Sequence, residues 1–157
     1  MVRQLRPWHY NTKKRIIKRP KIYFRDSGVL HALLSLEAKK YIVSHPKLGA
    51  SWEGFALEEI IRGLGLREDE AFFWGVHTGA EIDLLFKKRS KLYGVEVKYS
   101  QAPSLTPSMR FALRELSLKH LWVVYPGKEE YLLSRSITVI PLTGLNKINE
   151  RGGRFPE

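Results

Sequence analysis

Residues 81–98 of the chain read EIDLLFKKRSKLYGVEVK. EIDLLF and LYGVEVK both alternate with the period of two that is typical of a β-strand, and the short basic connector between them favours an antiparallel hairpin. If the tightest turn lies at Arg89-Ser90, Asp83 falls directly opposite Glu96, with Cβ atoms roughly 5 Å apart. Lys98 shares a strand face with Glu96. The stretch therefore predicts two carboxylates and an ammonium on one patch of one sheet face.

Two facing carboxylates destabilise a sheet, because like charges repel and one group is driven toward protonation. A divalent cation removes this conflict, since Mg²⁺ (or Mn²⁺) is bound by one or two carboxylates together with water and phosphate oxygens. Lys98 would then polarise the attacking water or stabilise the charge that develops on a phosphate. The alternative is a solvated sheet face on which Glu96 and Lys98 form an ordinary surface pair.

The chain has 157 residues, a net charge of +11 and no cysteine. Its length is that of one domain with a real core. The positive excess predicts association with a polyanion, and nucleic acid, above all DNA, is the first candidate; a solubility surface or a membrane-surface patch is the alternative. The lack of cysteine excludes disulfides and thiolate zinc sites. With no apolar run that could span a bilayer and no signal-peptide core, a cytoplasmic protein is expected.

Basic residues are concentrated near the N-terminus, where aromatic residues interleave with them. Such a composition suits phosphate contacts and base stacking, and it equally suits a β-ribbon with a solvated polar face. The residues for which we predict nucleic-acid contacts are Arg3, Arg6, Trp8, Lys13, Lys14, Arg15, Lys18 and Arg19. His77, in a predicted turn at 76–79, is added to this set, although a lone histidine in a turn is usually structural.

The rest of the chain alternates between predicted helices and strands. The N-terminal part is expected to contain a strand at 22–24, a helix at 28–38 capped by Asp26 or Ser27, a loop at 46–50 and a helix at 52–64 capped by Ser51. Around and after the hairpin we expect a strand at 71–74, a helix capped by Ser108 that extends to about residue 118, a buried strand at 120–125 and edge strands at 131–133 and 137–140.

Glu53 lies at the centre of the apolar stripe of the predicted helix at 52–64. A carboxylate there faces whatever the helix packs on, and a buried charge needs a partner or a metal. The alternative is a first-turn glutamate that favours the helix dipole and bends out to water. Glu58 and Glu59 fall off the stripe and are expected to face solvent.

From residue 51 to residue 125 the predicted order is helix, three strands, helix, strand, with Asp83 on the second strand and Glu96-x-Lys98 on the third. This pattern resembles the PD-(D/E)XK nuclease superfamily, whose restriction-endonuclease-like α/β core (αβββαβ) is a mixed sheet flanked by helices. Glu53 resembles the extra carboxylate of Holliday junction resolvase-like and RecB-like members. The resemblance implies metal binding by Asp83, Glu96 and Glu53, and catalysis by these three together with Lys98. Ile82 replaces the proline of the motif.

Nearly the whole chain also resembles the DUF4143 domain. The resemblance is carried by LRPWHYN at 5–11, PKIYFRDSG at 20–28, GAEID at 79–83 and VEVK at 95–98. That domain usually follows an AAA+ ATPase module in prokaryotic proteins, so the resemblance implies such a module as a partner. Because this chain has no G-x-x-x-x-G-K-[ST] phosphate loop, it is interpreted as a C-terminal fragment or a truncated reading frame.

We therefore expect a basic N-terminal extension of β-ribbon and helix at 1–48, a nuclease-like core with C-terminal edge strands at 49–145, and a frayed tail at 146–157. The expected function is that of a metal-dependent, nuclease-like DNA-binding domain that hydrolyses phosphodiester bonds. The alternative is a non-catalytic module of the same fold that binds nucleic acid or a protein partner for an ATPase. The choice between DNA and RNA and the formation of a homo-oligomer are left open.

Overall fold

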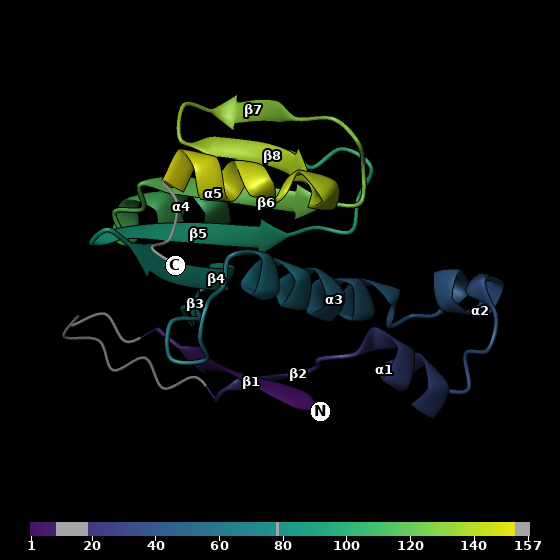
Figure 1. The fold of residues 1–157 in the computed structure, drawn as a ribbon. Helices are drawn as coiled ribbons and strands as arrows, with labels where there is room; N and C mark the ends of the chain where they lie inside the picture. The colour runs from purple at the N-terminus through teal and green to yellow at the C-terminus, as the bar shows by residue number, and fades with distance from the viewer. Residues whose placement is uncertain (9–18, 78, 153–157) are drawn as a thin grey trace.

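A computed structural model describes residues 1–8, 19–77 and 79–152, and its framework is an eight-stranded sheet (Figure 1). The strands in chain order are β1 (Val2–Pro7), β2 (Lys21–Phe24), β3 (Phe72–Gly75), β4 (Glu81–Lys88), β5 (Lys91–Val97), β6 (His120–Tyr125), β7 (Tyr131–Ser134) and β8 (Ile137–Pro141). The helices are α1 (Ser27–Leu33), α2 (Lys39–Ser44), α3 (Leu48–Gly63), α4 (Pro107–Glu115), α5 (Asn146–Gly152) and the short 3₁₀ helix η1 (Leu142–Gly144).

The strands lie in the order β2-β1-β3-β4-β5-β6-β8-β7. Neighbours from β3 to β5 are antiparallel, β5, β6 and β8 are parallel, and β7 closes the edge antiparallel to β8. β1 pairs antiparallel with β2 over its first residues and parallel with β3 at its end, so the N-terminal ribbon continues the sheet. The predicted mixed, helix-flanked α/β fold is confirmed, and the order from α3 to β6 is helix, three strands, helix, strand.

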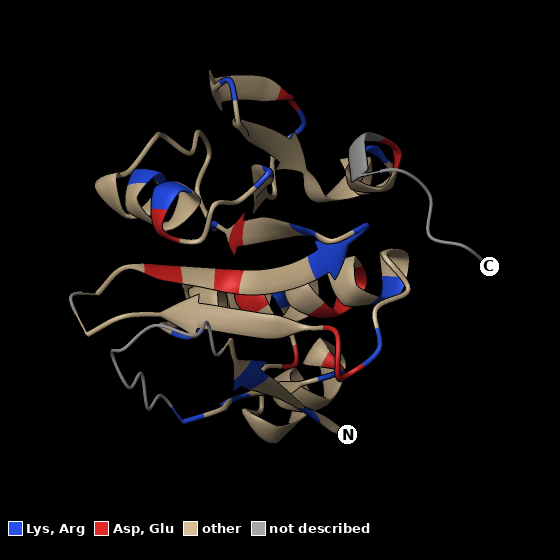
Figure 2. Cartoon of the chain, turned by 90° about the vertical axis from the view of Figure 1, so that its left-hand side faces the viewer, with Lys and Arg blue, Asp and Glu red and all other residues tan. Residues whose placement is uncertain are grey.

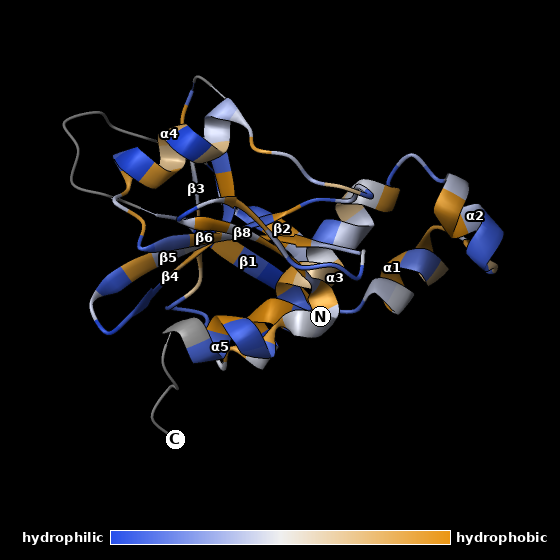
Figure 3. Cartoon of the chain, turned by 90° about the horizontal axis from the view of Figure 1, so that it is seen from above, coloured by the Kyte–Doolittle hydropathy of each residue, from blue (hydrophilic) through white to orange (hydrophobic). Residues whose placement is uncertain are grey.

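Helices cover both faces of the sheet: α3 and α5 lie on one side and α4 on the other (Figure 3). The α3 side buries apolar residues of α3 against Leu84, Phe86, Val95 and their neighbours. The α4 side buries Met109 and other α4 residues against the opposite faces of the same strands. Because central strands are buried on both faces, their sequences are apolar runs with few polar interruptions. The polar residues that do interrupt them, described below, therefore need an explanation.

Several element boundaries differ from the predictions, each for a local reason. α3 begins at Leu48, so Ser51 lies inside the helix, where it is buried and its hydroxyl is 2.7 Å from His31 Nε2. α1 ends at Leu33, because Ser35 adopts a left-handed φ of 55°. α4 is capped by Thr106 rather than Ser108, since Pro107 suits the first helical position.

The C-terminal region is more ordered than predicted. Residues 146–152 of the tail expected to fray form α5, whose Ile148 is buried in the core on the α3 side, and the rest of that tail lies outside the described residues. β8 is not an edge strand, since it lies between β6 and β7 and is buried at all five positions. α2, which no sequence pattern predicted, follows α1 at the far end of the molecule from α5 (Figure 1).

Candidate functional site

The candidate site lies where β4 and β5 separate. Their paired residues extend from Lys88 and Lys91 at the turn to Leu84 and Val95, which is the register predicted from a turn at Arg89-Ser90. Both turn residues have positive φ (47° and 62°), as a two-residue hairpin turn requires. Beyond Leu84 the backbone pairing stops, and Asp83 Oδ2 instead accepts a hydrogen bond of 2.9 Å from the Val97 amide. The Asp83 carboxylate therefore lies against the end of β5.

A register shift between β3 and β4 changes the direction of Asp83. Phe72 pairs with Leu85 but Trp74 pairs with Ile82, so β4 carries one extra residue in between. As a result, Ile82 packs in the α4 layer although Leu84 packs in the α3 layer. Asp83, between them, meets Lys21 and Glu53 on the α3 side, as the following contacts show.

β5 keeps its regular alternation. Glu96 pairs with Val123, which belongs to the α4 layer, whereas Val95 and Val97 belong to the α3 layer. The prediction that Asp83, Glu96 and Lys98 lie on one sheet face is therefore corrected. The two carboxylates approach each other from different faces, at the point where the strands diverge. Figure 2 shows acidic positions (red) grouped on the middle strands, with basic positions (blue) mostly toward the periphery.

On the α3 side, Lys21 joins three carboxylates. Its ammonium lies 3.4 Å from Glu53 Oε1, 3.4 Å from Asp83 Oδ1 and forms an ion pair with Glu81. Tyr23, two residues further along β2, donates a hydrogen bond of 2.5 Å to Glu53 Oε1. Burial and the nearby Glu53 charge raise the pKa of Asp83, although Lys21 opposes them. Glu53 thus faces the sheet as predicted, in contact with β2.

On the other side, Glu96 and Lys98 form an ion pair of 2.6 Å between Oε1 and Nζ. Glu96 Oε2 is buried and has no hydrogen-bond partner among the described residues. Burial, and next the charge of Asp83, raise the pKa of Glu96 to about 8. Burial is the largest single influence and lowers the pKa of Lys98, but the charge of Glu96, its hydrogen bond and the charges of Asp83 and Glu53 together outweigh it, so that the pKa is raised overall. A carboxyl group whose pKa is raised toward neutral pH by its surroundings is typical of functional sites.

The raised pKa of Glu96 predicts a pH dependence of stability in the metal-free protein. Because the folded state retains a proton that the unfolded state releases above about pH 4.5, the free energy of unfolding should be highest below that pH. It should fall by at most about 5 kcal/mol up to about pH 8. Glu96→Gln should reduce this slope by the contribution of Glu96 and leave that of Asp83, whose pKa burial and the Glu53 charge also raise. Urea unfolding in EDTA between pH 5 and 8 measures it; equal slopes for both proteins would contradict the burial of Glu96.

The donor set suits Mg²⁺ in its chemistry. Asp83 and Glu96 offer hard carboxylate oxygens, and Oε2 of Glu96, which is buried, finds no hydrogen-bond partner in the part of the chain that the structure describes. Two carboxylates with water and phosphate are a common Mg²⁺ arrangement. A protein cage is not available, since residues 1–8, 19–77 and 79–152 contain no group of three Asp, Glu or His side chains placed to hold a metal. Glu53 is engaged by Tyr23 and Lys21 instead.

The prediction that Arg3 contacts nucleic acid is corrected by the structure. It is buried on β1 and forms a two-pronged ion pair with Glu58 of α3, in which Nη2 lies 3.0 Å from Oε2 and Nε contacts Oε1. Glu58, expected to face solvent, is only 4% exposed. Both residues therefore serve the attachment of β1 to α3 and are not available to a phosphate.

The other predicted contacts are placed as follows. Arg6 and Arg19 are exposed, and His77 is exposed in the turn between β3 and β4. Trp8 packs edge-on against Phe72, with Lys87 Nζ 5.2 Å from its ring centre, so its ring is partly occupied within the protein. The remaining members of the set (Lys13, Lys14, Arg15 and Lys18) lie outside the described residues.

Sequence reasoning missed three site residues: Lys21, Tyr23 and Glu81. Lys21 lies in the basic N-terminal region, but it is not in the set predicted to contact nucleic acid. Its alternation with Tyr23 on a short strand, and that of Glu81 with Asp83, indicates shared faces. No local pattern shows that these two faces meet, because the contact depends on how β1 joins the ribbon to β3.

Comparisons with known proteins agree on the family and assign no activity. Residues 48–145 match the family described as Domain of unknown function (DUF4143), and residues 1–40 match Domain of unknown function (DUF8612). The chain is 42% identical over 141 residues to the uncharacterized proteins Rv2008c of Mycobacterium tuberculosis and Mb2031c of Mycobacterium bovis. The match covers 90% of this chain but 32% of each relative, so the chain spans about a third of their length.

No solved structure matches the chain. Within the part of the chain that the structure describes, every helix is too short or too polar to cross a membrane.

Proposed function

We propose that this chain, which belongs to the DUF4143 family, is a divalent-cation-dependent, nuclease-like domain that binds nucleic acid and hydrolyses phosphodiester bonds. The proposal is supported chiefly by Glu96. It is a buried carboxyl group, one oxygen of which has no hydrogen-bond partner among residues 1–8, 19–77 and 79–152, and its pKa depends on the charges of Lys98 and of Asp83 on the next strand. A purely structural carboxyl in this position would be expected to have both oxygens satisfied. The order from α3 to β6 is also that of PD-(D/E)XK nucleases.

The residues would divide the work as follows. Asp83 and Glu96 would hold the ion, which when bound supplies charge stabilisation and lowers the pKa of a water molecule. Asp83 is fixed by the Val97 amide, which orients its carboxylate toward β5. Lys98 has a side chain that is 41% exposed, so its ammonium can reach both Glu96 and an incoming phosphate. There it would orient the attacking water or stabilise the developing negative charge.

Glu53 would act through its neighbours. Its Oε1 accepts a hydrogen bond from the Tyr23 hydroxyl and lies near the Lys21 ammonium. Glu53 therefore holds in place the ammonium that contacts Asp83. We therefore keep Glu53 in the site as a positioning residue. The predicted role of Glu53 as a metal ligand would require it to exchange these partners.

A second candidate function is a non-catalytic module of the same fold. One observation favours it: the Lys21 ammonium contacts the carboxylates of Glu53, Glu81 and Asp83, so the negative charge of this part of the site is partly neutralised without any metal. Such a module would bind nucleic acid or a protein partner through its surface. Cleavage of DNA by the intact chain with Mg²⁺ or Mn²⁺ separates the two candidates. The AAA+ ATPase partner, a cytoplasmic location and self-association remain predictions.

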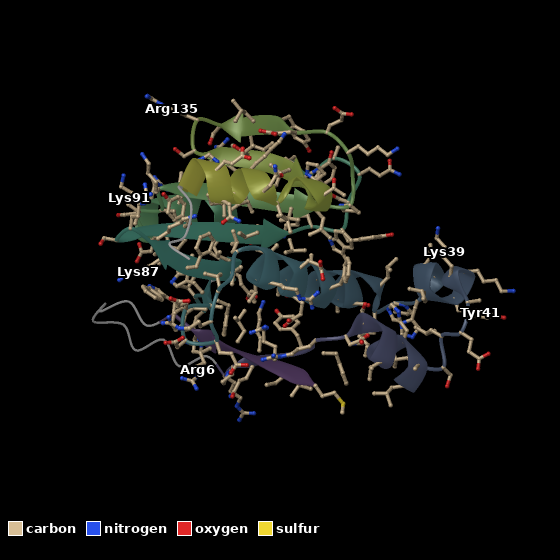
Figure 4. The ribbon with its side chains drawn as sticks, viewed as in Figure 1. Arg6, Lys39, Tyr41, Lys87, Lys91 and Arg135 are labelled. Carbon is tan, nitrogen blue, oxygen red and sulfur yellow. The ribbon has the colours of Figure 1, made fainter. Side chains whose placement is uncertain are left out.

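Nucleic-acid binding should depend steeply on salt. The net charge of +11 predicts that affinity falls as salt rises, because phosphate contacts release counterions. Arg6→Ala should reduce the slope of log affinity against log salt by about 1. Lys39→Ala is the matched control, because both residues are exposed but Lys39 lies on α2, at the other end of the molecule from Arg6 (Figure 4). Fluorescence anisotropy with labelled DNA measures both slopes; equal slopes in the two variants would remove Arg6 from the interface.

A further inference from the structure

Three aromatic side chains lie side by side next to the candidate site. Trp52 and Phe55 belong to α3, and Tyr99 follows the end of β5. The Trp52 ring centre lies 5.9 Å from that of Phe55 and 6.1 Å from that of Tyr99, which are ordinary distances for aromatic contacts. Tyr99 is nevertheless 49% exposed and Phe55 40% exposed. The three rings therefore form a connected aromatic surface that is open to solvent at both ends.

This aromatic surface adjoins the residues assigned to the chemistry. Tyr99 directly follows Lys98, and Trp52 directly precedes Glu53. The Lys98 amide donates a hydrogen bond of 2.9 Å to the Val124 carbonyl, so the chain is still paired with β6 here. Because side chains alternate along a paired strand, Lys98 and Tyr99 point to opposite faces, and the Tyr99 ring meets Trp52 on the α3 side. A nucleic-acid strand with a phosphate at Lys98 would therefore bring its neighbouring base to these rings.

Exposed rings beside a cation suit unpaired nucleobases. Every base can stack through its π-face, so such contacts tolerate any sequence. In a duplex the base faces are covered by neighbouring base pairs, so a protein ring can stack only on a base that has left the helix or was never paired. Trp52 and Phe55 also border an apolar hollow of about 220 Å³, which extends the surface beyond the rings. A nucleic-acid strand supplies both the aromatic faces for this surface and the anion for Lys98, whereas an apolar protein segment supplies no anion.

We infer that Trp52, Phe55 and Tyr99 stack unpaired bases next to the scissile phosphate, so that the substrate class is single-stranded or locally unpaired nucleic acid. The position of the scissile phosphate rests on the proposed function. The stacking itself is a binding contact that needs neither metal nor cleavage, so it can be measured in EDTA.

The test compares two labelled single strands of equal length and charge in EDTA. One is oligothymidine, and the other is an abasic strand, which keeps the sugar-phosphate backbone and lacks the bases. Wild type should bind oligothymidine more tightly. Tyr99→Ala and Phe55→Ala should each weaken oligothymidine binding by roughly 5- to 100-fold, as expected for the loss of a stacked base, and change abasic-strand binding by less than about twofold. Fluorescence anisotropy measures both affinities.

Two further variants make the comparison specific. Tyr99→Phe keeps a ring and should retain most of the affinity for oligothymidine. Phe111→Ala is the matched control, because Phe111 is 38% exposed and its ring centre also lies 6.1 Å from that of a tryptophan, Trp74. Phe111 belongs to α4, on the opposite side of the sheet from α3, so this variant should bind both strands as wild type does.

Three results would overturn the inference. The first is equal affinity of wild type for oligothymidine and the abasic strand, and the second is unchanged oligothymidine binding in both Tyr99→Ala and Phe55→Ala. The third is an equal loss of affinity for both strands in Tyr99→Ala, because the ring would then act through the fold and not on the bases.

Cleavage separates this inference from the proposed function. With Mg²⁺ or Mn²⁺, wild type should cut a single strand, or a duplex with an unpaired segment, faster than the same sequence fully paired, and Tyr99→Ala should reduce this preference. If binding depends on bases but no DNA is cut, stacking of unpaired bases stands as recognition by a non-catalytic module, and the proposed function fails. If fully paired duplex is cut as fast as the single strand, and Tyr99→Ala cuts both at the wild-type rate, the inference is overturned while the proposed function stands.

Discussion

Replacing Glu96 by glutamine should abolish cleavage of DNA and remove divalent-ion binding from the site. The amide keeps the shape of the side chain but loses the charge that holds the ion. The variant should still fold, because burial and the Asp83 charge disfavour a charged group at this position and do not disfavour a neutral amide. The same two influences raise the pKa of the native carboxyl. Mn²⁺ titration and a cleavage assay on the same preparation measure both effects. Retained cleavage in Glu96→Gln would exclude this carboxylate from the chemistry.

Lys98→Ala should have a different signature. If Lys98 acts on the reacting groups, its removal should lower the cleavage rate by roughly 10²- to 10³-fold while ion binding persists, because its role lies in the transition state. Lys91→Ala is the matched control: Lys91 is exposed, at the opposite end of the same strand β5 (Figure 4). It should leave the rate nearly unchanged. A loss of ion binding and rate together in Lys98→Ala would instead mean that Lys98 merely supports Glu96.

The second large effect concerns stability. Arg3→Ala should lower the free energy of unfolding by about 3–5 kcal/mol, because it leaves the Glu58 carboxylate buried and unpaired. The melting temperature should fall by roughly 10 °C. Arg62→Ala is the control, because Arg62 lies on α3, the helix that also carries Glu58. It breaks an exposed pair with Glu59 and should cost less than about 1 kcal/mol.

A double variant distinguishes the pair from its surroundings. Arg3→Met combined with Glu58→Leu removes both charges and retains much of their volume, so it should be much less destabilised than Arg3→Ala alone. Urea unfolding at constant pH measures the free energy of unfolding of wild type, Arg3→Ala, Arg62→Ala and the double variant. If Arg3→Ala cost no more than Arg62→Ala, the buried position of Arg3 would be wrong, and its predicted role in nucleic-acid binding would become tenable again.

The parts of the fold that the sequence predicts are those set by local interactions. The β4–β5 hairpin is predicted with its register, because alternation and a two-residue turn at Arg89-Ser90 define it within eighteen residues. The buried strand β6 is likewise evident from its apolar run. Pairings across long sequence separations are not: Arg3 meets Glu58 across 55 residues, and nothing near either residue indicates the other.

The candidate site is predicted in its membership and only partly in its geometry. Asp83, Glu96 and Lys98 do lie at the ends of adjacent strands, but the extra residue in β4 turns Asp83 toward α3. A bulge of this kind depends on the partner strand β3, so alternation within β4 alone is misleading. Lys21 was missed for a similar reason, because it reaches β4 only through the pairing of β1 with both β2 and β3.

The central claim is that Asp83, Glu96 and Lys98 form a metal-dependent phosphodiesterase site. The most direct measurement incubates the intact 157-residue chain with duplex, single-stranded and branched DNA, in Mg²⁺, in Mn²⁺ and in EDTA. We expect cleavage of at least one of these DNA forms with a divalent ion and none in EDTA, and no cleavage by Glu96→Gln under any condition. Wild-type protein that binds these DNAs but cuts none of them with either ion would contradict the claim and support the non-catalytic module.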